Sequence, residues 1–134
     1  MASDQAPRVI NVTDAEVRSV AVSRSGRWLA AGIRYGQVKV FNLETSAEHL
    51  SFKAHESDVW SVAFTNDSQT LATANGDWNR PGHVKLWNAQ SGQQAGSFQH
   101  TGEVLSLAIS PTQPQLAAGA ADKTVRIWTL PSDR

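Results

Sequence analysis

The sequence contains one pattern three times, and this internal repeat constrains the possible folds more than any other feature. Each copy opens with an acidic residue, at positions 16, 58 and 103, so the unit recurs after 42 and then 45 residues. The copies continue with a turn, a run of small residues, and a β-branched run that ends in Phe41, Trp87 or Trp128. A period of this length is typical of architectures in which neighbouring units share one continuous core.

The repeated runs predict β-strands rather than helices. They are short, rich in Val, Ile and aromatic residues, and bounded by turn-forming Asp, Ser, Gly and Pro, whereas apolar residues at helical spacing are absent. The expected strands are 16–22, 29–32, 38–41, 48–53, 58–64, 71–74, 84–87, 93–98, 103–109, 116–119 and 125–128.

The first strand of each copy has one small and one large face, and neither face is charged. In the first copy, Ser19 and Ala21 alternate with Val20 and Val22. A sheet with one solvated face would alternate apolar and polar residues, so both faces are expected to be buried. This requirement is met when the large face of one sheet packs on the small face of the next around an axis. The sequence therefore predicts the four-stranded blades of a β-propeller.

The copies resemble the WD40 repeat, in which a His precedes the first strand and a Trp ends the third. The resemblance covers roughly residues 8–130 and is in phase in all three copies, although the first copy has Thr13 and Phe41 at the His and Trp positions. It implies an all-β fold of three four-stranded WD40-type blades. The matching residues are His55 and Trp87 in the second copy, and His100, 103–109 and 116–128 in the third.

In this family a His, a Ser or Thr, an Asp and the motif Trp form a buried hydrogen-bonded network in each blade. Ala118 stands where the third copy should carry its hydroxyl, and an insertion displaces the Asp position of the second copy. The second and third blades are nevertheless expected to be better fixed than the first, which lacks the set, because such networks contribute only when satisfied. The resemblance assigns this structural network to His55, Thr73, Trp87, His100, Asp122 and Trp128.

The ends of the repeat array are offset from the blade boundaries. The third copy stops after three strands, and an unassigned apolar stretch precedes the first copy. We expect Val9, Ile10 and Val12 in that stretch to supply the outer strand of a blade in another chain. The resulting division is a flexible tail at 1–7, an outer strand at 8–12, blade 1 at 13–54, blade 2 at 55–99, blade 3 without its own outer strand at 100–130, and a tail at 131–134.

Three blades cannot close a propeller, since propellers use about four to eight blades. The sequence therefore predicts an incomplete propeller closed by oligomerisation, in which copies assemble head to tail into six blades as a dimer or nine as a trimer. The alternative is a fragment or structural segment of a larger regulatory protein, or one half of a split propeller.

The resemblance implies a non-catalytic platform for protein or peptide binding. The insertion at 75–83 joins a second and a third strand, on the face where WD40 proteins usually meet partners, and Trp and Arg are frequent interface anchors. Two further aromatic residues receive structural predictions: Trp28 partly buried against a neighbour, and His49 solvated on an outer strand. The partner-binding candidates are Glu16, Arg18, Asp58, Trp60, Trp78, Arg80, Glu103 and Leu105.

Other function classes have little support. Catalytic motifs are absent, and an enzyme with a site in the axial channel would need a titratable cluster that the sequence does not show. The 12 basic and 12 acidic residues cancel, which disfavours nucleic-acid binding. With no cysteine and no metal-binding motif, we expect no cofactor and no metal. The sequence has no membrane-spanning apolar run and no secretory signal, so a cytoplasmic location is expected.

Overall fold

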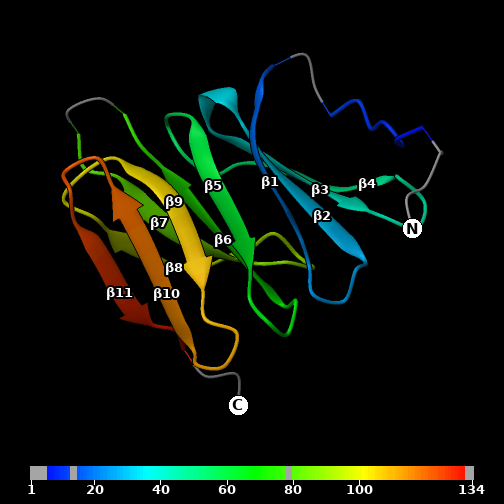
Figure 1. Cartoon of the computed structure of the whole chain (residues 1–134). Helices are drawn as coiled ribbons and strands as arrows, with labels where there is room; N and C mark the ends of the chain where they lie inside the picture. The colour runs from blue at the N-terminus through cyan, green and yellow to red at the C-terminus, as the bar shows by residue number, and fades with distance from the viewer. Residues whose placement is uncertain (1–5, 13–14, 78–79, 132–134) are drawn as a thin grey trace.

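A computed structural model describes residues 6–12, 15–77 and 80–131, and within them the chain forms three antiparallel β-sheets stacked side by side (Figure 1). The strand orders are β1-β2-β3-β4, β5-β6-β7-β8 and β11-β10-β9. The strands are β1 Val17–Val22, β2 Trp28–Ile33, β3 Gln37–Asn42, β4 Glu48–Lys53, β5 Val59–Phe64, β6 Thr70–Asn75, β7 His83–Asn88, β8 Gln94–Gln99, β9 Val104–Ile109, β10 Gln115–Ala120 and β11 Val125–Thr129.

The eleven runs from 16–22 to 125–128 each form a strand, with ends that differ by no more than one residue. The predicted insertion at 75–83 needs a correction, because Asn75 ends β6 and His83 begins β7. The Asn75 side chain joins the two strands: its Oδ1 accepts the His83 N–H at 2.8 Å, and its Nδ2 donates to Ser57 Oγ at 2.9 Å. The β6–β7 loop therefore comprises only residues 76–82.

The sheets pack through unlike faces, as the alternation of small and large residues predicts. In the first junction, Ala30, Val38 and Val40 of the first sheet form one cluster with Val62 and Phe64 of the second. All five are less than 9% exposed, and the inner strand β5 lies between β1 and β9 (Figure 1). Each junction is thus a small hydrophobic core, and hydrophobic burial between neighbours holds the stack together.

The second junction repeats this arrangement with the next pair of sheets. Ala74, Val84 and Leu86 of the second sheet are buried in a cluster with Val104 and Leu116 of the third. The same face of the third sheet adds Leu107 and Ile109, which are partly buried against that cluster.

The two terminal sheets each leave one apolar face open. Val20 and Val22 on β1 are 60% and 57% exposed, and Val125 and Ile127 on β11 are 66% and 64% exposed. The third sheet also ends at β11, with no fourth strand among the described residues. Residues 8–12 belong to none of the three sheets, so the inter-chain strand of Val9, Ile10 and Val12 stays a prediction.

A buried hydrogen-bonded group joins three elements of the second sheet. His55 Nε2 lies 2.8 Å from Thr73 Oγ1, and Trp87 Nε1 donates to the same oxygen at 2.9 Å. Because Thr73 accepts from the indole, its hydroxyl hydrogen is free to donate to a neutral imidazole. Burial, reinforced by Lys85 and His83, lowers the pKa of His55 from 6.5 to about 3, which keeps the ring neutral.

The corresponding group in the third sheet is incomplete. His100 is 1% exposed, and no described residue lies within hydrogen-bonding distance of its Nε2. Ala118 occupies the position of Thr73 and has no hydroxyl to offer. Asp122 does not bond to His100: its two carboxylate oxygens accept from Thr101 Oγ1 and from Thr124. The full network assigned to the third copy therefore does not form among the described residues.

A hydroxyl at position 118 is expected to stabilise the third sheet. Ala118→Thr would place an oxygen beside the unpartnered His100 Nε2, whereas Ala118→Val adds the same bulk without a hydroxyl. We expect the Thr variant to be more stable than the Val variant by about 1 kcal/mol, the net value of one buried hydrogen bond. Urea unfolding of the two proteins measures this difference, and equal stabilities would contradict it.

His55 is expected to make the fold acid-sensitive. Its pKa is about 3 in the folded chain and 6.5 when exposed, so between these values the unfolded state binds a proton that the folded state does not. The stabilising contribution is present above about pH 6.5 and is lost as the pH falls towards 3. His55→Gln should lower the stability at pH 7.5 but flatten its fall down to pH 5 in urea titrations. A His55→Gln protein whose stability falls with pH as steeply as that of the wild type would contradict this.

Candidate functional site

The predicted contact residues meet at the end of the stack where β1, β5 and β9 begin. A hollow of about 360 Å³ opens there, between the β2–β3 connection, the start of β5 and the β6–β7 loop. Four of the predicted residues lie around it, although they come from three different sheets. The lining residues are Arg18, Arg34, Tyr35, Ser57, Asp58, Trp60, Gly76, Asp77 and Glu103.

Arg18 of the first sheet is held by two side chains of the second. Its Nε donates to Asp58 Oδ2 at 3.0 Å, and its guanidinium carbon lies 5.0 Å from the centroid of the Trp60 ring. Asp58 uses its other oxygen to accept the Tyr35 N–H at 2.8 Å, and Trp60 Nε1 donates to Gly76 O at 3.2 Å. The ion pair is about a quarter exposed, so it is only partly screened by water.

A second arginine and an aromatic ring form the outer rim. Arg34 Nη1 donates to Glu16 Oε1 at 2.7 Å, and its guanidinium carbon lies 4.7 Å from the centroid of the Tyr35 ring. The hydrogen bond from Arg34 lowers the pKa of Glu16, but both side chains are open to solvent, so the pair adds little stability. Tyr35, with φ 72°, and Gly36, with φ 95°, form a left-handed turn that leaves the Tyr35 ring 64% exposed.

Gly76 allows the third sheet to approach the hollow closely. A Cβ added to this glycine would lie 2.5 Å from Glu103 Cγ, which is closer than non-bonded carbons approach. Only glycine therefore lets the β6–β7 loop lie against Glu103, while its carbonyl oxygen receives the Trp60 indole. Residues of the second and third sheets therefore come together at this loop.

Three other predicted contact residues, Glu16, Leu105 and Arg80, do not line this hollow. Glu16 faces Arg34, and Leu105, 46% exposed on β9, does not line the hollow. Arg80 lines two neighbouring hollows of about 510 and 290 Å³, the second of which also includes Glu103. Trp78 lies outside the described residues.

Sequence reasoning missed Arg34, Tyr35 and Gly76. The insertion signal pointed to the β6–β7 loop, but the exposed aromatic residue belongs to the shorter β2–β3 connection. No clear sequence signal points to it, because tyrosine is not one of the residues that favour positive φ.

The arrangement offers the chemistry of protein recognition. Two guanidinium groups stack on two aromatic rings beside carboxylates, and aromatic and arginine side chains are enriched where proteins contact one another. Among residues 6–12, 15–77 and 80–131, no three His, Asp or Glu side chains come together as metal ligands would. Within the same ranges, no helix is long and apolar enough to cross a membrane.

The WD domain, G-beta repeat family matches the chain in three stretches, 8–42, 47–88 and 92–129. The chain belongs to the WD40 family. The second and third WD40 stretches begin just ahead of β4 and β8, and the three stretches end with β3, β7 and β11.

The related proteins are much longer than this WD40 chain. It is 33% identical over 119 residues to apoptotic protease-activating factor 1 of Rattus norvegicus, covering 87% of the chain and 9% of that protein. It is 29% identical over 125 residues to the target of rapamycin complex subunit wat1 of Schizosaccharomyces pombe, covering 92% of the chain and 38% of that protein. The chain thus spans well under two thirds of the length of either relative.

Two solved structures share the WD40 fold of this chain. They are U3-55K, with a TM-score of 0.82, and the RRP9 WD40 repeats, with a TM-score of 0.83. Each is 20% identical to the chain, and each match covers 91% of the chain and 38% of the solved structure.

Proposed function

We propose that this WD40 chain is a non-catalytic platform for protein binding, and that copies of it complete a propeller head to tail. The observation that carries the proposal is that the two open faces are of opposite kinds and can pack on each other, as the faces of neighbouring sheets do within the chain. Val20 and Val22 stand at the repeat positions of Val62 and Phe64, which are buried on the first sheet. A chain that presents this face at one end needs the opposite kind of face to cover it.

The other end of the stack presents that opposite face. Val125 and Ile127 stand at the repeat positions of Val84 and Leu86, which are 0% and 2% exposed because the third sheet covers them. A junction between two chains would therefore repeat the two junctions already present within one chain. A contact between unlike faces is heterologous, and it closes into a ring of six blades from two chains or nine from three.

The free edge of β11 gives a second reason for head-to-tail contact. The family match begins at residue 8 in the first stretch and at 47 and 92 in the others, just ahead of β4 and β8. Because the second and third stretches start at an outer strand, the equivalent start of the first stretch supports residues 8–12 as the missing outer strand. Val9, Ile10 and Val12 would then face a neighbouring copy. An unpaired strand edge next to an apolar face promotes association with another chain, and pairing with 8–12 would remove that edge.

A second candidate is that the three blades form part of a longer propeller. The coverage of 38% of wat1 and of both solved structures favours it, because the remaining blades of those proteins lie outside the match. In that case the same two faces are covered by further blades of one polypeptide. The platform role is unchanged, because the hollow around Arg18, Asp58 and Trp60 opens at the end of the stack rather than on either open face.

Complementary variants test the assembly. Val20→Asp and Ile127→Asp each place a charge on one open face, which prevents burial of that face against another copy. Each protein alone should therefore have the mass of one chain in light scattering. An equimolar mixture should form a dimer, because each variant still presents one intact face of the opposite kind. The wild type should have the mass of two or three chains, and deletion of residues 1–12 should weaken its assembly.

A matched control for these variants is Gln93→Asp, which adds the same charge in the exposed β7–β8 turn and should assemble like the wild type. A monodisperse wild-type monomer would contradict ring closure and favour the longer propeller. A mixture that stays monomeric would contradict contact between unlike faces.

Loss of the Trp60 ring is expected to impair partner binding without affecting assembly. Trp60→Ala and Arg18→Ala remove the stacked pair at the hollow, so proteins retained by the wild type on an affinity column should be lost. The Gln93→Asp protein should retain them, and Trp78→Ala tests the neighbouring loop. If the Trp60→Ala column retains the same proteins in the same amounts, this hollow is not the contact surface.

A further inference from the structure

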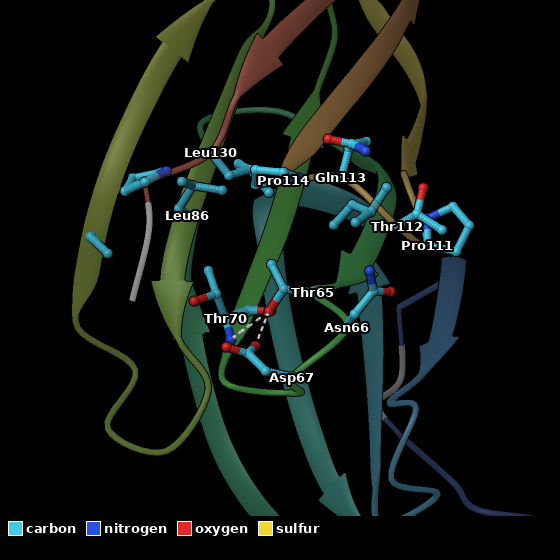
Figure 2. A pocket seen from close by; sticks show the side chains of 13 residues that line it. Thr65, Asn66, Asp67, Thr70, Leu86, Pro111, Thr112, Gln113, Pro114 and Leu130 are labelled. Carbon is cyan, nitrogen blue, oxygen red and sulfur yellow. Dashed lines mark hydrogen bonds between the residues drawn. The ribbon is translucent and has the colours of Figure 1, made fainter. Parts of the chain in front are cut away.

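A second hollow lies at the opposite end of the stack, between the second and third sheets. It has a volume of about 450 Å³ and lies between the β5–β6 turn on one side and the β9–β10 turn on the other. Figure 2 shows Leu86, Pro114 and Leu130 at one end and Thr65, Asp67 and Thr70 at the other. Both walls belong to one chain, so this groove does not depend on the proposed ring.

The junction between the first and second sheets has an aromatic side chain at the same place. Trp28 opens β2, just as Thr70 opens β6, and it is only 9% exposed in a cluster with Phe64 and Ala89. Its ring centroid lies 4.6 Å from that of His49, and the Arg27 guanidinium carbon lies 5.3 Å from the indole centroid. His49 Nε2 lies 3.1 Å from Gln90 O of the second sheet. The Arg27-Trp28 pair and His49 thus fill the first groove.

The second groove has lost both rings. Thr70 stands at the position of Trp28, and Ala95, the second residue of β8, stands at the position of His49 in β4. Two other positions of the wall stay apolar, with Ile109 at the place of Phe64 and Leu130 at the place of Ala89. Leu130 is larger than Ala89, yet a hollow still remains where the first junction holds an indole.

We propose that this groove binds a tryptophan side chain of a partner peptide, with a basic residue beside it. The first junction shows that an indole fits between two such sheets in this chain, with a guanidinium lying over its outer side. The basic residue follows from the same junction, where Arg27 directly precedes Trp28 and its guanidinium lies over the indole. The site differs from the hollow around Trp60 both in its place and in the aliphatic side chains of Leu86, Ile109 and Leu130 that line it.

The probe for the titration is the dipeptide acetyl-Arg-Trp-amide, with acetyl-Arg-Ala-amide as its control. In methyl NMR spectra of the chain, the tryptophan peptide should shift the signals of Leu86, Ile109 and Leu130 in a saturable manner. The alanine peptide should not shift them. The same titration on Ile127→Asp should give the same shifts, because that change affects the assembly face and not the groove; the two proposals can therefore fail separately.

Filling the groove from within should prevent binding. Thr70→Trp, alone or with Ala95→His, recreates the first junction, and should weaken the peptide at least tenfold while leaving the melting temperature at or above that of the wild type. Gln115→Trp is the matched control: it adds an indole at the same repeat position on the open face of the third sheet and should leave binding unchanged. If Thr70→Trp does not fold, Ala95→Phe blocks the groove from β8 instead.

Three results would overturn the proposal. The first is the absence of methyl shifts at saturating peptide, and the second is equal shifts with the alanine peptide. The third is binding that appears only after deletion of residues 132–134, which follow Pro131 at the edge of the groove. In that case the occupant would be the chain's own end rather than a partner peptide.

Discussion

Burial of unlike sheet faces is the constraint on which the rest of this structure depends. No sheet here can cover both of its own faces, and each junction is satisfied only because small residues such as Ala30 meet large ones such as Phe64. The hydrophobic effect is non-directional, so this difference in side-chain size is what orders the sheets one after another. It also fixes which ends stay open, because the first sheet keeps its large face and the third its small face.

The same stacking creates the candidate site. Arg18 and Asp58 are 40 residues apart in the chain, and they meet only because the start of β1 lies beside the start of β5. The contacts of Asp58 with Arg18 and with the Tyr35 N–H join the first sheet to the second, so no single blade could form the hollow. A WD40 protein can therefore vary its recognition surface by changing loop residues while the stack beneath stays the same.

The fold could be predicted from the sequence because the same succession of turns and strands, with the same alternation of small and large residues, occurs three times at nearly constant spacing. The strands were predicted almost residue for residue, since each is bounded by turn formers and carries the same small and large faces. The site was predicted only in part. The residues at the start of the first strands could be named, but the turn that exposes Tyr35 depends on left-handed backbone geometry that the repeat pattern does not encode. The groove beside Thr70 could not be foreseen either, because a missing ring leaves space only if its neighbours do not move in.

Among the described residues, the second sheet is the only one whose two faces are both covered within one chain, and this has a consequence for stability. In a linear array, a unit is stabilised by its own hydrogen bonds and by each neighbour that it contacts. The central unit has two neighbours and a satisfied His55–Thr73–Trp87 group, whereas the third unit has one neighbour, an unpaired edge at β11 and an unpartnered nitrogen on His100. We therefore expect the two terminal sheets, which a neighbouring blade must recognise, to open before the central one.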